Sequence, residues 1–441
     1  MPISSLVHML TLFISFAYTT EICEVSEKTI ALIMSVFESS DKDRHEILLH
    51  AVHCLILLHR ERELDDTRIA NSLISMMDKL TEADASGLYA ESYLYLAEKG
   101  IEVVSLGRFL PHMTSVDIGH ILETSAHANR TPGCLWNVAV EKLLTSDFRH
   151  SIVFLSAQLR SRCEHSPLLA SQGMSAISNT LLSEKSPSTD VALKFLVEFF
   201  HSFDSETFFP VESMLPLWFC IAMTHIESDD LVRISQFIYS GFRSFIKDKC
   251  FSIKDFNSDT PSTNNIAQWI FESLNEISRK NDGWARDAAV RWLEPVVCML
   301  QKAVIKSTME VCMQSCRIGS HIFQFASHLI YRSPSHCKFN QSLFVRLCKL
   351  FIQNTLLVRS FEGSFLDEVV PKYFSGLLAL PIASSSYLQR VLVDFVEKFC
   401  VDYSLRQKMK TILSEHSRVI PLLYAACKAD CAAFSFFTAI A

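Results

Sequence analysis

The sequence predicts an all-α protein, an irregular α-solenoid of HEAT-like or armadillo-like helical hairpins. Apolar residues recur at spacings of three and four along nearly every segment, whereas the strict alternation of a half-buried strand is rare. The chain has only 11 glycines and 13 prolines in 441 residues, so it lacks the turn residues that β-sandwiches, barrels and glycine-loop nucleotide enzymes require. Its composition, 49% apolar and 20% charged, is that of a globular protein with a large core.

Three helices are predicted in the first hundred residues. The first occupies residues 41–60, where Asp41 caps the opening turn and the apolar residues form one broad face. The second, at 65–80, and the third, at 86–99, show the same periodicity. Gly100 follows the third helix directly, where a residue in the left-handed conformation would end it.

The same periodicity predicts helices along the rest of the chain, at 191–203, 231–246, 265–277, 284–293, 296–305, 311–331, 343–358, 387–400 and 420–438. Prolines, Pro371 among them, are expected between these stretches or at their starts, where a missing N–H costs least. Successive helices of this kind, joined by short connections, are typical of an α-solenoid. Because no motif recurs at a fixed period, two or three separate helical bundles are the alternative.

A polar segment at 255–265 divides the chain and is expected to be a hinge or an exposed loop. It separates an N-terminal helical array, 1–254, from a C-terminal array, 266–441. The first array is acidic at its start, since residues 1–130 carry 19 acidic and 10 basic side chains. Residues 331–410 carry 6 acidic and 11 basic side chains, so the two ends of the chain differ in charge.

The largely apolar run from Leu6 to Tyr18 is expected to be a buried first helix. A signal segment or membrane anchor is the alternative, although no Lys or Arg precedes Lys28 and no cleavage site is evident. The 14 cysteines show no CxxC pair and no regular spacing, which indicates reduced thiols in the core and a protein of the nucleus or cytosol.

No residue pattern indicates a metal site or a catalytic centre, so we expect neither cofactor nor small-molecule substrate. Four histidines lie close together, but no two have the four-residue spacing of a zinc-protease helix: His45, His50, His53 and His59. Two cysteine pairs are four residues apart and are expected to share helix faces as small apolar residues: Cys312 with Cys316, and Cys427 with Cys431. The chain contains no GxGxxG, GxxxxGK[ST] or GxSxG motif, and we predict that it is not an enzyme.

The residues most suggestive of binding lie between 311 and 361, a stretch without Asp or Glu. It contains six basic residues that are candidate contacts to nucleic acid or an acidic partner: Arg317, Arg332, Lys338, Arg346, Lys349 and Arg359. The alternative is that these cations surround an apolar core and cover it with their aliphatic stems. Upstream, three tryptophans are interleaved with basic residues and are expected to pack in the core rather than stack on bases: Trp269, Trp284 and Trp292.

Residues 365–400 form a further pattern, in which a helix leads into Pro371-Lys372-Tyr373-Phe374, a short loop follows Leu380-Pro381, and a second helix opens at Tyr387 and ends at Phe399. This pattern resembles the closing helices of the MMS-sensitivity scaffold family, which works at damaged replication forks. The resemblance implies a non-enzymatic nuclear scaffold that binds a repeat-containing repair factor and supports recombinase loading. It implies no catalytic residues.

The sequence therefore favours a helical scaffold of genome maintenance, which supports homologous recombination repair of stalled or collapsed forks through protein partners and a contact to DNA. A cytoplasmic HEAT-type adaptor in trafficking or transport would share the same fold without any link to DNA. A membrane-anchored or secreted helical protein that uses residues 1–20 is a third hypothesis.

Overall fold

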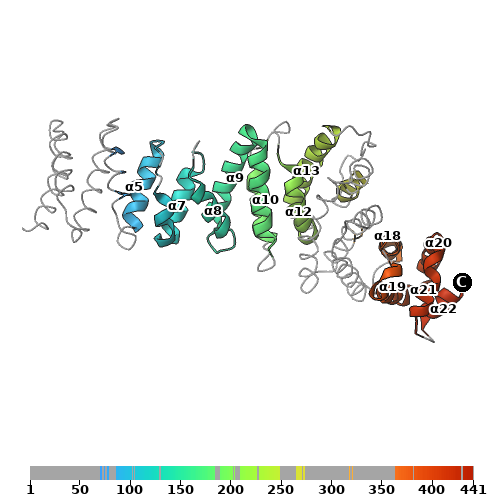
Figure 1. Cartoon of the computed structure of the whole chain (residues 1–441). Coiled ribbons are helices and arrows are strands. Elements are labelled where there is room, and N and C mark those ends of the chain that lie inside the picture. The colour runs from blue at the N-terminus through green and yellow to red at the C-terminus, as the bar shows by residue number, and fades with distance from the viewer. Residues whose placement is uncertain are drawn as a thin grey trace, which may run out of the picture. The chain divides into compact units, whose positions relative to one another are not determined.

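The computed structural model describes two long stretches of the chain, with short gaps, and isolated helical positions (Figure 1). The stretches are 86–248 without 102, 104, 129–130, 184–188, 202, 204–208, 226–227, and 363–440 without 381 and 429–430; the isolated positions are 70, 71, 74, 77, 78, 265–270, 272, 273, 317 and 320. Every regular element in these parts is an α-helix or a 3-10 helix, which confirms the all-α prediction. Among the described residues, no helix is long and apolar enough to cross a membrane.

The chain divides into two compact units, residues 1–161 and 162–441. The boundary falls within helix α9, Phe148–His165. The hinge predicted at 255–265 lies outside the described residues except for Asn265, which is helical, and stays a prediction.

The first unit contains most of α9 and the described helices before it. They are α5 (Ser86–Glu98), α6 (Leu106–Phe109), the 3-10 helix η1 (Leu110–His112), α7 (Ser115–Ser125) and α8 (Gly133–Lys142). Helix α5 ends as predicted, because Gly100 has a φ of 73°. Helix α5 packs on α7, and α6 packs on α8, so helices contact their second neighbours along the chain.

Local chemistry explains where the first-unit helices start and what they bury. Thr114 caps α7: its hydroxyl accepts a hydrogen bond from the Asp117 amide at 3.2 Å and donates one to the Asp117 carboxylate at 2.7 Å. Tyr89 of α5 is fully buried, stacks on Phe109 with ring centroids 3.9 Å apart and hydrogen-bonds Ser105 at 2.8 Å. Its burial raises the pKa of the phenol to about 12.

The second unit continues the pattern of contacts between second neighbours. Its first four helices are α10 (Pro167–Leu181), α11 (Thr189–Phe200), α12 (Val211–Thr224) and α13 (Asp229–Asp248). Helix α10 packs on α12 and α11 packs on α13, while neighbouring helices also touch. Trp218 of α12 is fully buried and donates a hydrogen bond to Ser235 of α13 at 3.0 Å.

The C-terminal helices repeat this arrangement. They are α18 (Gly363–Leu378), η2 (Ile382–Ser384), α19 (Ser386–Phe399), α20 (Tyr403–Ser414), η3 (Ser417–Val419), α21 (Ile420–Ala426) and α22 (Ala432–Thr438). Helix α18 packs on α20, α19 packs on α21, and α22 covers α19 and α21. Contacts to both the first and the second neighbour in sequence are the packing of a two-layered helical solenoid, and they confirm the predicted fold class.

Several predicted helices can be compared directly with the structure. Those at 191–203, 231–246 and 387–400 are found, as α11, α13 and α19. The single helix predicted at 420–438 is wrong, because α21 ends at Ala426 and α22 starts at Ala432. The predicted helices at 41–60, 284–293, 296–305 and 343–358 lie outside the described residues, as does the apolar run that ends at Tyr18.

Pro371 also departs from the prediction, since it lies inside α18 rather than at a start or a break. Proline has no N–H to give the carbonyl four residues earlier, which here belongs to Asp367. That carbonyl instead accepts a hydrogen bond from Nζ of Lys408 on α20, at 3.2 Å. A side chain of the neighbouring helix thus replaces the missing backbone bond, and α18 runs through the proline.

Candidate functional site

One of the six predicted basic contact residues, Arg317, is described by the structure. Arg332, Lys338, Arg346, Lys349 and Arg359 lie outside the described residues and stay a prediction. Arg317 is helical, and its side chain is about one-third exposed.

Arg317 contacts α18. Its Nε lies 3.4 Å from a carboxylate oxygen of Glu368, and its guanidinium lies 5.3 Å from the ring centroid of Phe365. The stretch 311–361 is free of acidic residues in sequence, but its Arg317 has an acidic neighbour in space. At this position the structure shows the packing role that we considered as the alternative, a cation paired and laid over an aromatic side chain.

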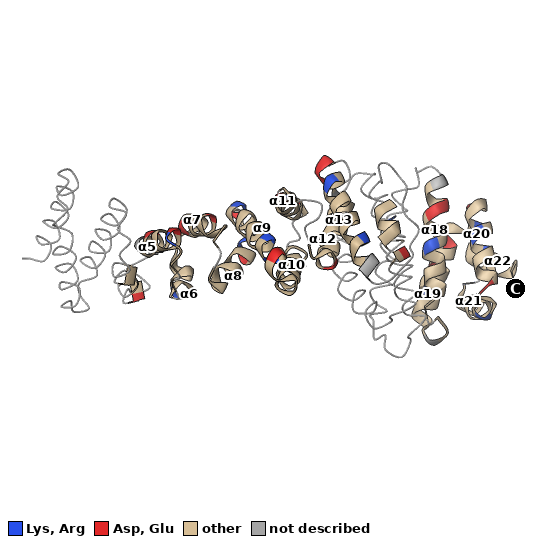
Figure 2. Ribbon diagram, turned by 90° about the horizontal axis from the view of Figure 1, so that it is seen from above, with Lys and Arg blue, Asp and Glu red and all other residues tan. Residues whose placement is uncertain are grey.

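The two adjacent acids of α18 organise the charges around them. Glu368 also pairs with Lys372 one turn later, at 3.4 Å. Asp367 pairs with Lys408 of α20 at 3.2 Å and accepts hydrogen bonds from the Ser404 hydroxyl at 3.0 and 3.2 Å. Figure 2 shows acidic and basic residues on α18 and basic residues on α20. This charge network holds α20 against α18.

A second group of basic residues, which the sequence analysis did not single out, lies on α20. Three residues at spacings of three and four share one side of this helix: Tyr403, Arg406 and Lys410. We call them the α20 stripe. The Tyr403 side chain is 77% exposed and neighbouring Val401 is 80% exposed, the two most exposed large apolar residues of the described part. The signal by which the stripe could have been predicted is the helical spacing of its three residues in the sequence.

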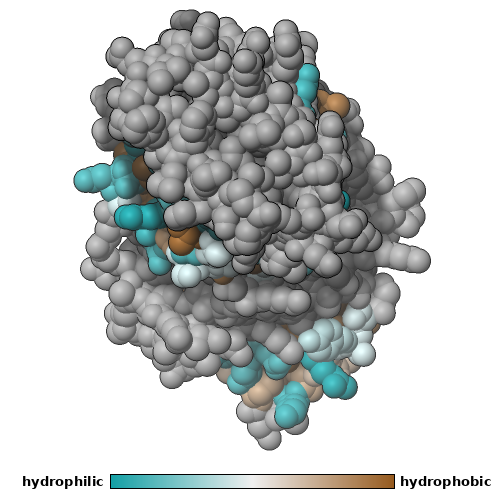
Figure 3. All heavy atoms as spheres, turned by 90° about the vertical axis from the view of Figure 1, so that its left-hand side faces the viewer, coloured by the Kyte–Doolittle hydropathy of each residue, from teal (hydrophilic) through white to brown (hydrophobic). Residues whose placement is uncertain are grey.

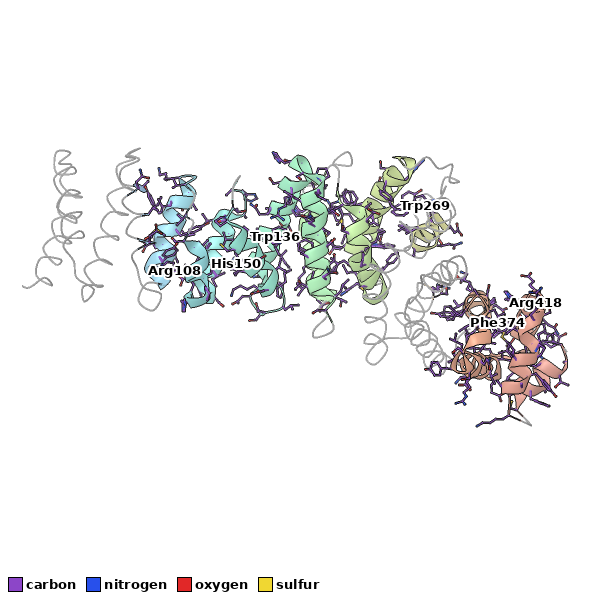
Figure 4. The ribbon with its side chains drawn as sticks, viewed as in Figure 1. Arg108, Trp136, His150, Trp269, Phe374 and Arg418 are labelled. Atoms are coloured by element: carbon purple, nitrogen blue, oxygen red, sulfur yellow. The ribbon has the colours of Figure 1, made fainter. Side chains whose placement is uncertain are left out.

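The predicted tryptophan cluster is described only at Trp269, which is 5% exposed. Its ring packs against Tyr239, with centroids 4.9 Å apart, and against Phe242, at 5.7 Å. Figure 4 shows Trp269 together with the side chains of the neighbouring helices. Trp269 therefore packs in the core, as expected, and is not open to stacking on a base; Trp284 and Trp292 lie outside the described residues.

Cys427 and Cys431 do not share a helix face, which corrects the prediction. Cys427 follows the last residue of α21, and Cys431 caps α22 by accepting a hydrogen bond from the Phe434 amide at 3.3 Å. The described cysteines are free thiols, and burial raises the pKa of Cys163 and of Cys427 to about 12. High thiol pKa values make these cysteines poor nucleophiles. The pair Cys312 and Cys316 lies outside the described residues.

Glu397 of α19 completes the start of α22. Its carboxylate accepts hydrogen bonds from the amides of Ala432 at 3.1 Å and Ala433 at 2.6 Å. Partial burial alone would raise the pKa of this carboxyl, but the two amides and the Cys431 thiol outweigh burial and lower it. The arrangement fixes α22 on α19 and is structural.

The described part of the chain offers no grouping suited to bound metal. It contains no group of three or more His, Cys, Asp or Glu side chains placed to hold an ion. The histidines at 45, 50, 53 and 59 lie outside it. On the face shown in Figure 3, the described surface has hydrophilic atoms bordering small apolar areas.

Comparison with known proteins adds little to this picture. No family model and no curated protein matches the chain. Among solved structures, the chain is similar to a circular tandem repeat protein with novel repeat topology and enhanced subunit contact surfaces, at 15% identity and a TM-score of 0.23. The similarity covers 96% of this chain and 97% of that one, but a TM-score of this size is too low to indicate a shared fold.

Proposed function

We propose that this chain is a non-enzymatic helical scaffold of the nucleus that binds other proteins and supports homologous recombination repair of stalled or collapsed replication forks. The observation that carries the scaffold role is the repeated contact between second-neighbour helices, α10 with α12, α11 with α13, α18 with α20 and α19 with α21. Helix pairs stacked in this way place their exposed surfaces side by side. Together these surfaces form an extended area that can bind another macromolecule.

The assignment to genome maintenance rests on the resemblance of residues 365–400 to the MMS-sensitivity scaffold family. In the structure, α18 runs through Pro371-Lys372-Tyr373-Phe374 and α19 ends at Phe399. The partners that follow from this proposal are a repeat-containing repair factor and a recombinase.

Affinity purification of the tagged chain, followed by mass spectrometry, tests the proposal. Recovery of replication and recombination proteins, enriched after fork stalling and absent with an unrelated helical protein of similar size as bait, is the expected result. Recovery of coat or karyopherin components instead would favour a cytoplasmic adaptor and contradict the proposal. Imaging of the tagged chain gives a separate readout, because the proposal requires it in the nucleus.

The proposed contact to DNA through residues 311–361 has its own test. Arg346 and Lys349 are three residues apart in a predicted helix and would share one side of it. Changing both to Glu should weaken binding to DNA and flatten its dependence on salt, because fewer phosphate contacts release fewer counterions. Arg317→Glu gives the same kind of charge reversal at a single position and should change binding less than half as much, since Arg317 is already paired with Glu368.

A further inference from the structure

The α20 stripe is the side of this helix that carries unpaired positive charge. The apolar residues Leu405, Met409 and Leu413 are buried. Lys408 lies to one side of this buried line, roughly 100° around the helix, and pairs with Asp367. Arg406 and Lys410 lie on the opposite side, turned away from the helix that supplies Asp367, and have no ion pair within the described part of the chain.

The acidic residues nearest to the stripe in sequence form no ion pair with it. Asp402 accepts a hydrogen bond from the Leu405 amide at 3.0 Å, so its carboxylate is engaged in capping α20. Glu415 follows Lys410 by five residues, which turns it roughly 140° away around the helix. Two cations therefore lie one turn apart, about 6 Å along the axis, and neither has an ion pair among the described residues.

From this arrangement we infer that the α20 stripe binds single-stranded nucleic acid, with Arg406 and Lys410 on successive phosphates and Tyr403 stacked on a base. Arg406 and Lys410 are half-buried, so ordering them on a ligand loses less freedom than ordering fully exposed side chains. The inference places the contact outside stretch 311–361, and its biological meaning rests on the proposed role in genome maintenance.

Tyr403 is the residue that favours nucleic acid over an acidic protein segment. The face of an aromatic ring carries partial negative charge, so a carboxylate gains nothing by lying on it. A base has a π-face of its own and stacks on tyrosine beside cations that contact the backbone, which is the usual composition of a single-strand binding surface. The 77% exposure of Tyr403 leaves its ring free for such a contact.

Fluorescence anisotropy of a labelled oligodeoxythymidine, titrated with the full chain at several salt concentrations, tests the inference. The double variant Arg406→Gln with Lys410→Gln should lower the slope of log K against log salt by about 1.4, at about 0.7 for each lost phosphate contact. Tyr403→Ala should weaken binding about five-fold or more at every salt concentration, whereas Tyr403→Phe keeps the ring and should bind as the parent does.

A matched control removes one arginine and one lysine elsewhere among the C-terminal helices. Arg390 on α19 and Lys428 after α21 are exposed and have no ion pair within the described residues, so Arg390→Gln with Lys428→Gln changes net charge by the same amount. For this control variant, the slope of log K against log salt should equal that of the parent chain. The charge-preserving variant Arg406→Lys with Lys410→Arg should also retain binding, and circular dichroism of each variant confirms that the helices are intact.

Three results would overturn the inference. The first is a parent chain that does not bind the oligonucleotide; the second is a control variant that loses as much slope as the stripe variant. The third is competition by polyglutamate that is unaffected by Tyr403→Ala, which would identify an acidic protein segment as the ligand. The proposed function is tested separately: if the parent chain recovers repair proteins on purification but does not bind the oligonucleotide, the scaffold role stands and this inference does not.

Discussion

Gln158 of α9 holds the end of α7 in place, and removing its side chain should loosen that region. The side chain is 8% exposed. Its Nε2 lies 3.2, 2.9 and 3.1 Å from the carbonyl oxygens of Ser125, Ala126 and Ala128, and its Oε1 accepts a hydrogen bond from the Thr131 hydroxyl at 3.0 Å. These carbonyls lie at and just beyond the C-terminal end of α7, and that of Ser125 also accepts a hydrogen bond from the Ala128 amide at 3.2 Å.

Gln158→Ala should lower stability because it removes a hydrogen-bond donor from buried carbonyl oxygens. A buried polar group without a partner costs about 1–3 kcal/mol, and the side-chain amide can donate two hydrogen bonds at a time. Because water can reach the part-buried Ala128 carbonyl, we expect a loss of about 2 kcal/mol in the local opening free energy. Gln158→Glu should cost more than Gln158→Ala, since it sets a carboxylate against carbonyl oxygens.

Hydrogen exchange read by mass spectrometry on the peptide that spans α7 measures this locally, which matters because the two units need not unfold together. A loss of 2 kcal/mol corresponds to amide exchange about thirty-fold faster. Gln407→Ala on α20 is the matched control, because Gln407 is exposed. In this variant the α7 peptide should exchange at the same rate as in the parent chain. Exchange in Gln158→Ala within three-fold of the parent would refute the reasoning.

Three further predictions have defined outcomes. Gly241→Ala places a Cβ against a buried phenylalanine ring and should lower the unfolding midpoint, whereas Gly87→Ala meets no atom within 4 Å and should raise stability by up to about 1 kcal/mol; thermal denaturation compares them. Pro371→Ala supplies the missing amide in α18, so Lys408→Met should cost less in that background than in the parent, as a double-mutant cycle in urea would show. The lowered pKa of Glu397 stabilises α22 above the carboxyl's ordinary value of 4.5, and this stability is lost as pH falls below it; Glu397→Gln should abolish that pH dependence in hydrogen exchange of α22.

Features that depend on the chemistry of one residue were predictable from the sequence. Gly100 ends α5 because glycine adopts a positive φ without strain, and the sequence places it directly after an amphipathic stretch. The same holds for α19, where Ser385 caps the first turn by accepting a hydrogen bond from the Leu388 amide and the apolar periodicity ends at Phe399. Such signals are local, so no knowledge of the neighbouring helices is needed.

The break between α21 and α22 was not predictable in this way. Apolar residues continue from Ile420 to Thr438 at helical spacing, and the periodicity alone indicates one helix. Helix α22 starts where the carboxylate of Glu397, 35 residues earlier on α19, accepts a hydrogen bond from the Ala432 amide. A cap supplied by another element leaves no mark in the sequence of the helix that it caps.

Ion pairs between residues far apart in the sequence were likewise not predictable from the sequence. The stretch 311–361 was predicted to bind nucleic acid or an acidic partner because it contains no acidic residue. In the structure its Arg317 pairs with Glu368, which is 51 residues away in sequence. On α20 three cations lie within five residues, and what separates them is which side faces α18: Asp367 engages Lys408 and leaves Arg406 and Lys410 to the other side. Pairing therefore separates Arg317, which Glu368 engages, from Arg406 and Lys410, and the exposed Tyr403 ring beside these two cations distinguishes the α20 stripe from other unpaired cations of the second unit.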